Sequence, residues 1–495
     1  MSTLQDLTAP GRAIVKPLRQ WLPPARFSQI SSGQWLACMM IAAAALQLAA
    51  YWPGILHNDS TMQYAQAITG HMTDWHPPLM TWIWQQLHKV YAGPAPMLLL
   101  QAILYWTGFA LLARGAWIQE KRWHAFAIGA CALMPLSLAW NGAVLKDALM
   151  AGALLTAAGL LAINQAKPKT SFRVIGIVMV LFAAAIRFNA FFGCLPLMVF
   201  LLPEAWRKTP LRAVTVTIVA TLTLMLVPFA TTKLVRAQPS GVELSLVIFD
   251  LGGITEESGV NVFPSANVAD MVRKNHACYT PRFWDNYGWW IKDGRCALSF
   301  HVVRETLRTH HVSPYSVWLK AIAAHPIAYA RHRWSHFEIN TRFIARMGIK
   351  RPIWNEARTI FPYRPQPNYA LSTIDWLAFR NAQIPLGWPA CWMALAAGLL
   401  MIARDLPSRR IIVPLALSAL TYGAGYLVIS VASDLRYHMW TMMAASIAGM
   451  IALADVLETR SIDRRQITIA ALPLLVVTLI AVMARLILPY GPPSA

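Results

Sequence analysis

The sequence predicts an all-α polytopic membrane protein with about eleven transmembrane helices. Of the 495 residues, 57% are hydrophobic and only 13% are charged, which is unlike a water-soluble enzyme. Apolar runs close to the ~20 residues that a helix needs to cross a bilayer recur along the chain. The loops between them are short and rich in Lys and Arg, the pattern that marks cytoplasmic loops. We therefore expect the net charge of +21 to orient the chain in a membrane, and we expect no nucleic-acid partner.

The apolar runs divide the chain into four predicted regions. Residues 1–33 form a basic arm, which the positive-inside rule places in the cytoplasm. Residues 34–232 form an N-terminal transmembrane module, and residues 52–95 within it form the first exported loop, with juxtamembrane helices. Residues 233–385 form a large exported loop, for which we expect a mixed or irregular structure. Residues 386–495 supply the C-terminal transmembrane helices.

The distribution of basic residues determines the predicted topology. The segment 77–91 is apolar but short and begins with two prolines, so we expect it to lie on the membrane surface. Every short basic loop then falls in the cytoplasm, whereas counting 77–91 as a span would place them all outside. In the large loop, we expect residues 316–334 to form one amphipathic helix at the membrane interface. The predicted spans lie near residues 34–51, 96–117, 125–140, 148–165, 174–187, 190–203, 213–232, 386–403, 411–431, 437–457 and 466–487.

Cysteines and metal-ligand types give little further guidance. Cys278 and Cys296 share the large loop, and the sequence leaves open whether they form a disulfide. No loop shows a ligand spacing typical of a metal site. We therefore expect no obligatory metal and no required cofactor.

Under this topology, the polar residues of the membrane region gather at its outer face. Ionisable residues at membrane depth are costly, and they are usually paired or functional. Each has a purely structural explanation as well, because an aspartate can cap a helix and an arginine can reach lipid headgroups. Their gathering, rather than any one of them, predicts a site. The residues are Asp59, Asp74, His76, Lys146, Asp147, Arg187, Asn189, Arg436, Tyr437 and His438.

This set of side chains suits sugar transfer from a lipid phosphate. An acidic residue at the membrane edge can take the proton of an attacking hydroxyl. Nearby Arg and Lys side chains can hold the phosphate that leaves. A site at the membrane boundary also admits the lipid tail of the donor. The sequence therefore predicts a glycosyltransferase whose donor is a sugar linked to polyprenyl phosphate.

The chain resembles the GT-C superfamily of integral membrane glycosyltransferases, in the branch of the protein O-mannosyltransferases and the lipid A aminoarabinose transferases. The resemblance rests on an acidic residue just after the first span, Asp59, and on the motif His76-Pro77-Pro78-Leu79 in the same loop. Asp147 stands where the family often carries an acidic residue in its second exported loop. The resemblance implies catalytic roles for Asp59, Asp147 and His76. In the mannosyltransferases an Asp-Glu pair follows the first span, whereas Ser60 follows Asp59 here.

Two further motifs resemble outer-edge motifs of bacterial GT-C members in which arginine contacts the carrier phosphate. They are Arg187-Phe188-Asn189 and Arg436-Tyr437-His438. We expect Lys146, Arg187 and Arg436 to bind the donor phosphate and Asp59 to act as the base. The other polar residues of the set are expected to contact substrate, namely Asp74, Asn189, Tyr437 and His438.

The predicted reaction is inverting transfer at the periplasmic face of a bacterial inner membrane. The expected partners are the lipid-linked donor, membrane lipids and an acceptor, which would be a surface polysaccharide, a lipopolysaccharide or lipid A. Two alternatives remain open. An O-antigen-type polymerase or ligase with polyprenyl diphosphate donors would not need the acidic first loop. A lipid or glycan transporter would place its polar residues along a path through the bundle midplane.

Overall fold

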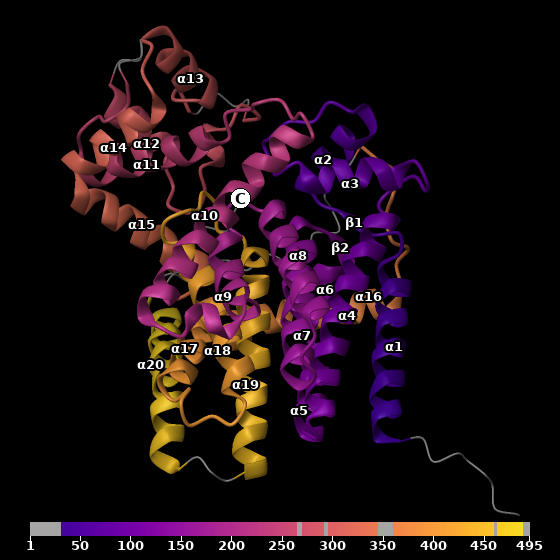
Figure 1. Cartoon of the computed structure of the whole chain (residues 1–495). Helices are drawn as coiled ribbons and strands as arrows, with labels where there is room; N and C mark the ends of the chain where they lie inside the picture. Colours follow the sequence, from indigo (N-terminus) through magenta and orange to yellow (C-terminus); the bar gives the residue numbers. More distant parts are fainter. Residues whose placement is uncertain (1–30, 265–269, 292–295, 345–359, 460–462, 489–495) are drawn as a thin grey trace, which may run out of the picture.

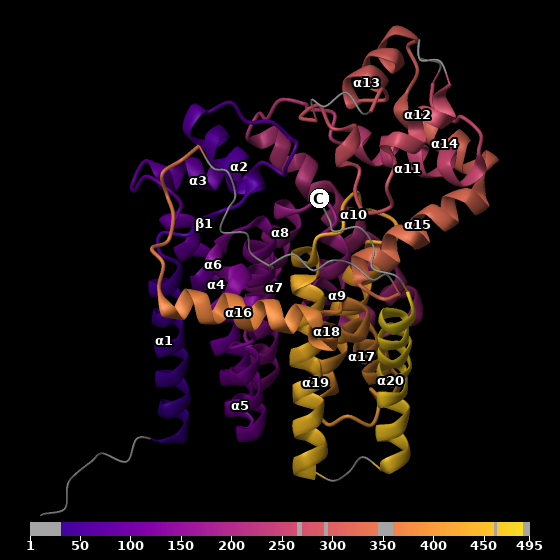
Figure 2. The ribbon, with the colours of Figure 1, turned by 180° about the vertical axis from the view of Figure 1, so that it is seen from behind.

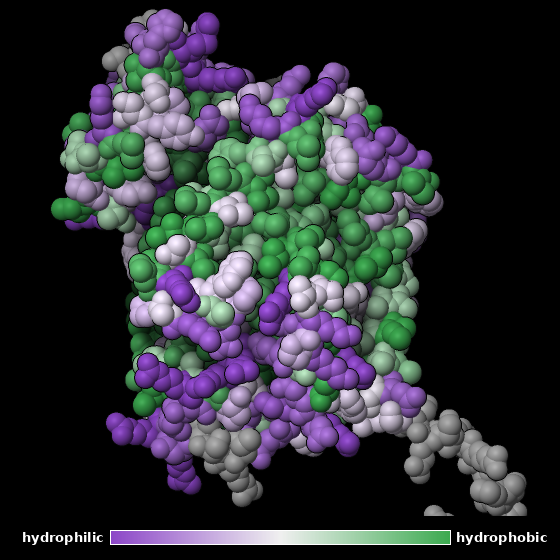
Figure 3. Space-filling model, viewed as in Figure 1, coloured by the Kyte–Doolittle hydropathy of each residue, from purple (hydrophilic) through white to green (hydrophobic). Residues whose placement is uncertain are grey.

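The computed structural model describes residues 31–264, 270–291, 296–344, 360–459 and 463–488. Upright helices form a bundle, and helices of the large loop form a domain over one end of it (Figure 1). On the face shown in Figure 3, an apolar belt crosses the bundle, and hydrophilic residues gather above and below it. In the part of the chain that the structure describes, strands are limited to one pair of two residues each. The prediction of an all-α polytopic membrane protein is confirmed.

The elements fall into three groups along the chain. The N-terminal module contains α1 (Ser32–Tyr51), β1 (Ile55–Leu56), α2 (Asn58–Thr69), α3 (Leu79–His88), α4 (Ala95–Ile118), α5 (Arg122–Cys131), α6 (Pro135–Gly142), β2 (Ala143–Val144), α7 (Lys146–Ala166), α8 (Thr170–Ile186), α9 (Phe191–Leu201), η2 (Glu204–Arg207) and α10 (Pro210–Leu234). The large loop contains α11 (Glu243–Ser258), α12 (Met271–Cys278), η3 (Asp285–Tyr287), α13 (Phe300–Thr309), α14 (Pro314–Ala324), α15 (Pro326–Thr341) and α16 (Tyr369–Gln383). The C-terminal region contains η4 (Pro385–Gly387), α17 (Pro389–Met401), α18 (Arg409–Gly425), η5 (Leu435–His438), α19 (Met439–Thr459) and α20 (Arg464–Ile487).

Six of the described helices are long and apolar enough to cross a membrane. The bent pair α5 and α6 would make a seventh crossing, and α8, α9 and α17 are shorter apolar helices. The expected number of about eleven spans therefore stays a prediction. Helix α3 has 10 residues, too few to cross a hydrocarbon core of about 30 Å at about 1.5 Å per residue. A crossing by the segment 77–91 is thus disfavoured, as the charge pattern indicated.

Proline interrupts two helices that the sequence analysis expected to be continuous. The expected span 125–140 is two helices, α5 and α6, bent by 54°. The expected amphipathic helix 316–334 is likewise two helices, α14 and α15, which meet at His325. Pro135 and Pro326 each open the second helix of the pair. Proline has no backbone N–H to continue a preceding helix, but it fits the first turn of a new one.

Close packing of α4 against α7 places α7 at the centre of the bundle. A Cβ atom added to Gly108 of α4 would lie 2.7 Å from the backbone of Leu155 and Thr156. A Cβ atom on Gly159 of α7 would lie 2.8 Å from the carbonyl oxygen of Gly108. Small residues let two membrane helices approach to backbone contact. The most apolar stretch of α7 is buried throughout, so its first residue, Lys146, begins in the middle of the bundle.

The short strand pair aligns the two loops that carry the predicted site. Strands β1 and β2 are parallel, and Ile55 pairs with Ala143 as Leu56 pairs with Val144. Gln101 of α4 donates from Nε2 to the carbonyl of Ala143 at 2.6 Å. Because β1 leads into α2 and β2 leads into α7, the first residues of these two helices begin side by side.

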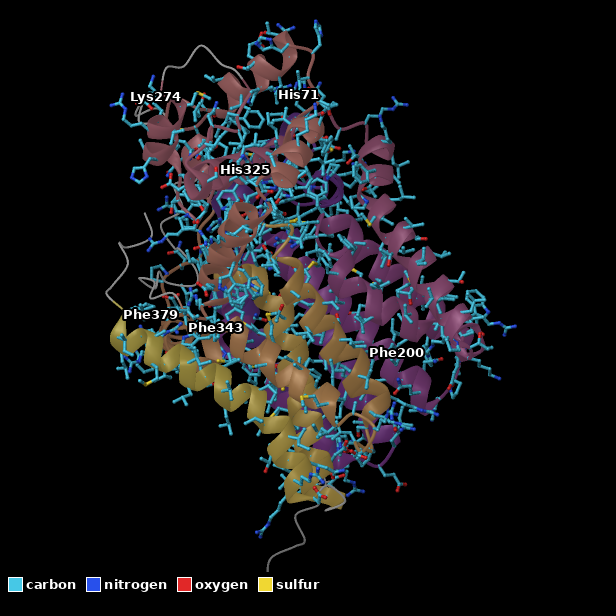
Figure 4. The ribbon with its side chains drawn as sticks, turned by 90° about the vertical axis from the view of Figure 1, so that its left-hand side faces the viewer. His71, Phe200, Lys274, His325, Phe343 and Phe379 are labelled. Atoms are coloured by element: carbon cyan, nitrogen blue, oxygen red, sulfur yellow. A yellow bond between two sulfur atoms is a disulfide. The ribbon has the colours of Figure 1, made fainter. Side chains whose placement is uncertain are left out.

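The large loop has its own core and a buried charge cluster. Asp250 of α11 is fully buried, and its carboxylate lies 2.5 Å from Arg333 and 3.0 Å from His332, both on α15. Cys278 and Cys296 form a disulfide with a Cα–Cα separation of 4.9 Å, which settles a pairing that the sequence left open. In Figure 4, Lys274 of this domain lies well above Phe200 of the bundle.

Helix α16 returns from the large loop to the bundle. In Figure 2, it runs crosswise over the upright helices. Its N-cap residue, Asn368, donates a side-chain hydrogen bond to the carbonyl of Ala50 at 2.9 Å. The end of the large loop is thereby fastened beside the end of α1, just before the first loop begins.

Candidate active site

The first turn of α2 directs Asp59 toward the bundle. Ser60 ties this turn to the residue before it, because its hydroxyl accepts from the His57 amide at 2.7 Å and donates to the His57 carbonyl at 3.0 Å. Helix α2 begins at Asn58 with His57 as its N-cap residue, so Asp59 lies inside the first turn and is not the N-cap, which was its simplest structural explanation. Gly70 ends α2 in the left-handed conformation, with φ of 76°, as glycine readily does.

Two cations from distant parts of the chain meet at Asp59. Its Oδ2 atom lies 2.9 Å from Nη2 of Arg436, in η5, and 3.3 Å from Nζ of Lys146, at the start of α7. The Asp59 side chain is 26% exposed, whereas that of Arg436 is 5% exposed. The carboxylate thus stands between two largely buried cations and keeps an open side.

Each of these two cations also contacts a histidine ring. Nζ of Lys146 lies 2.8 Å from Nδ1 of His76, and Nη1 of Arg436 lies 3.3 Å from Nδ1 of His57. Burial and Lys146 lower the pKa of His76 to about 3, and burial and Arg436 lower the pKa of His57 to about 4. Both rings are therefore neutral at physiological pH, and each can accept a hydrogen bond from its cation.

The same charges keep Asp59 ionised. Burial raises the pKa of the Asp59 carboxyl, but Lys146 and Arg436 lower it by more and hold it well below its usual range. A base with so low a pKa accepts a proton poorly, because a general base works best with a pKa near the ambient pH. In the free site, the Asp59 carboxylate is therefore ion-paired with Lys146 and Arg436 and is a weak base.

A second ion pair lies beside the first. Asp147 is paired with Arg187, and both side chains are buried. Nε of Arg187 donates to Oδ1 of Asn189 at 3.2 Å. The ring of Tyr437 lies 4.7 Å from the Arg187 guanidinium and 5.5 Å from that of Arg436. Lys146 and Asp147 are neighbours in the chain but have different partners, Asp59 and Arg187.

Two of the predicted substrate-binding residues lie outside this cluster and join parts of the chain. Oδ1 of Asp74 accepts from both the amide and the hydroxyl of Ser240 at 2.6 Å. Nε2 of His438 lies 2.6 Å from Oδ1 of Asn340, on α15. These contacts fasten the first loop and η5 to the large loop. A role of Asp74 or His438 in substrate binding stays a prediction.

Three further residues interact with the site and were not predicted from the sequence. His57 contacts Arg436, and Oδ2 of Asp434 lies 2.9 Å from Nε of the same arginine. In the large loop, burial and the charge of Asp59 raise the pKa of Asp285 to about 6. The position of Asp434, two residues before Arg436, was a usable signal. The sequence around Asp285 carries none, because the approach of η3 depends on a hydrogen bond from the Trp284 amide to the Val431 carbonyl at 2.8 Å.

The site provides three cations, two paired with Asp59 and one paired with Asp147, and each could exchange its carboxylate for another anion. Lys146, Arg187 and Arg436 each hold a carboxylate now, and each can bind a phosphate oxygen instead. Among the described residues, no group of three or more His, Cys, Asp or Glu side chains converges as a metal site would require. The chemistry that these residues can support is anion binding next to a carboxylate base.

Comparison with known proteins gives a likeness to solved structures. No family model matches the chain, and no curated protein matches it. The chain is similar to the crystal structure of ArnT from Cupriavidus metallidurans bound to undecaprenyl phosphate, with 14% sequence identity and a TM-score of 0.32. The match covers 86% of this chain and 78% of that one. A likeness at this identity and score decides nothing about activity, which has to be argued from the site.

Proposed function

We propose that the chain is an integral membrane glycosyltransferase of the GT-C type. It would transfer a sugar from polyprenyl phosphate to an acceptor hydroxyl at the periplasmic face of a bacterial inner membrane. The observation that carries the proposal is the contact of Asp59 with two cations, at 2.9 Å from Arg436 and 3.3 Å from Lys146. A carboxylate and phosphate-binding cations are the two kinds of group that the reaction needs.

The three cations would stabilise the phosphate that leaves. The donor phosphate carries negative charge and gains more as its bond to the sugar breaks, so side chains that hold it favour the transition state. Lys146 and Arg436 would bind its oxygens, and Arg187 would add a third contact. His76 would orient Lys146, and Asp147 would orient Arg187, because each is that cation's contact in the free site. Asn189 and Tyr437, which contact Arg187, would complete the donor side.

Phosphate binding would also activate the base. When the phosphate takes Lys146 and Arg436, the Asp59 carboxylate loses the charges that depress its pKa. Its pKa then rises toward the range in which a carboxylate accepts a proton effectively. The donor would thus prepare the base, and the site would stay inactive toward hydroxyl groups until the donor is bound.

The transfer step is a single inverting displacement. The acceptor hydroxyl gives its proton to Asp59 while its oxygen forms a bond to the anomeric carbon of the sugar. The bond from that carbon to the phosphate oxygen breaks, and its electron pair leaves with the phosphate. One carboxylate is enough for this step, since no covalent intermediate has to form. Ser60, which stands where the mannosyltransferases carry a second acidic residue, is hydrogen-bonded to the His57 backbone.

Cells that lack the gene provide the test. Mass spectrometry of their envelope glycans should show the loss of one sugar residue, whose mass identifies the sugar. A plasmid copy of the wild-type gene should restore that mass, and the Asp59→Asn variant, expressed at the same level, should not. Unchanged glycans in the deletion strain, or full restoration by Asp59→Asn, would rule out the proposed function.

A further inference from the structure

A cavity of about 320 Å³ opens beside the candidate site, where the first loop meets the large loop. Met62, Gln66 and Thr73 line it from the first loop, and Trp289, His301 and Arg304 line it from the large loop. Its size lies at the lower end of the range of about 300–1,000 Å³ typical of ligand pockets. None of the residues that line it is in contact with Asp59 through a described hydrogen bond or ion pair.

One wall of the cavity is aromatic. The ring of Trp75 lies 4.6 Å from that of Trp289 at an interplanar angle of 78°, and 5.9 Å from that of Phe300. Phe300 is buried and supports the two indoles, whereas Trp289 is 36% exposed. Two tryptophan rings set nearly at right angles offer a flat face and an edge to a ligand. An indole face carries negative charge density and attracts the weakly positive C–H groups of a ligand.

The other side of the cavity is polar and open to water. Gln66 and Thr73 are bonded to each other, from Nε2 of the glutamine to the hydroxyl at 3.0 Å. His301 and Arg304 are exposed and lie one turn apart on α13. No carboxylate is among the described residues that line the cavity. This combination of flat aromatic rings and hydrogen-bonding side chains is suited to a ligand that has both C–H faces and many hydroxyl groups.

We propose that this cavity binds a carbohydrate, as the acceptor glycan of the proposed transferase. A sugar ring would pack against Trp289 and Trp75, and its hydroxyls would bond Gln66, Thr73 and Arg304. A lipid acyl chain would take water away from His301 and Arg304 and offer them no hydrogen bond in return, which is costly in a binding site. The inference rests on the proposed function, and it narrows the acceptor to the carbohydrate part of an envelope glycan.

Helix α2 connects the cavity to the base. Asp59 lies in its first turn, and Met62 and Gln66 follow three and seven residues later. Residues at this spacing share one face of a helix. At about 1.5 Å per residue they lie roughly 5 and 10 Å along the axis from Asp59. A glycan of several sugar units held in the cavity can therefore extend along this face and present a hydroxyl to Asp59.

Binding of a lipid-free glycan to the full-length protein in nanodiscs tests the inference. The probe is the polysaccharide released by mild acid from the lipopolysaccharide of the cells that encode the chain, measured by isothermal titration calorimetry. Replacement of Trp289 by alanine should weaken binding at least tenfold, and Trp289→Tyr should weaken it less. Trp334→Ala is the matched control, since this exposed tryptophan of α15 lies outside the cavity, and it should change the affinity less than twofold.

The proposed carbohydrate site and the proposed transferase activity can be refuted independently of each other. Asp59→Asn should bind the polysaccharide as the wild-type protein does while failing to transfer sugar. Equal affinity of wild-type protein, Trp289→Ala and Trp75→Ala for the polysaccharide would overturn the inference. Binding of lipid A vesicles without any binding of the polysaccharide would also overturn it. Transfer activity in Asp59→Asn would instead refute the proposed function and leave the glycan site standing.

Discussion

Replacement of Asp59 by asparagine should have opposite effects on donor binding and on sugar transfer. In the free site, Asp59 occupies the same cations that would hold the donor phosphate. Asparagine has nearly the same shape but no charge, so it releases both cations and cannot take a proton. Binding of a polyprenyl phosphate should therefore become tighter while transfer is lost. A residue that merely supported the fold would weaken both.

The structure sets the size of both effects. A hydrogen bond to a charged group contributes about 1.5–3 kcal/mol net. Because the Asp59 side chain is 26% exposed, water screens its contacts with Lys146 and Arg436. We therefore take the lower end of this range as the free energy that the phosphate must overcome to displace the carboxylate. Phosphate binding should then tighten by about 1.5 kcal/mol, or roughly tenfold in Kd. Loss of the general base should slow transfer by roughly 100- to 10,000-fold.

Titration of the purified protein with farnesyl phosphate, a short and soluble polyprenyl phosphate, measures the first effect. Transfer is followed in the same preparation with the lipid-linked sugar donor. Arg436 should keep its place in the variant, because Oδ2 of Asp434 remains 2.9 Å from its Nε. Asp405→Asn, an exposed aspartate between α17 and α18, is the matched control and should change neither quantity. Weaker phosphate binding by Asp59→Asn would refute the reasoning that phosphate and carboxylate compete.

Three further predictions follow from individual groups. Lys146→Met keeps the length of the side chain but removes its charge, and it should weaken farnesyl phosphate binding by about 1.5–3 kcal/mol; unchanged affinity would exclude a phosphate contact. The pKa of Asp285, raised to about 6, means that its stabilising protonated form is lost as the pH rises through 6. Asp285→Asn should therefore raise the melting temperature at pH 8 more than at pH 5, and an equal gain at both would contradict this. The disulfide between Cys278 and Cys296 joins residues 18 positions apart. Cys278→Ser should therefore destabilise the large loop by about 3 kcal/mol in the chain-entropy model. Limited proteolysis should then cleave that loop faster than in the wild-type protein, and an unchanged rate of cleavage would contradict the prediction.

The sequence was sufficient to identify the class of protein and most of the charged residues of the site. Apolar runs and basic loops follow from the energetics of a bilayer, which act on each segment by itself. Ionisable residues beside such runs are costly enough to be noticed one at a time, and Asp59, Lys146 and Arg436 stood out for this reason. Gly70 ends α2 in a left-handed conformation, which is a local property of glycine.

The tertiary structure decided which of these residues act on one another. Asp59 and Arg436 are 377 residues apart, and nothing local to either one predicts their contact. The pairing of β1 with β2 brings Asp59 to Lys146, and packing of the large loop brings Asp285 near and closes the aromatic cavity. Two of the expected helices proved to be broken at Pro135 and Pro326. Long-range pairings depend on the free energy of the whole packed chain, whereas the bilayer acts on each segment alone.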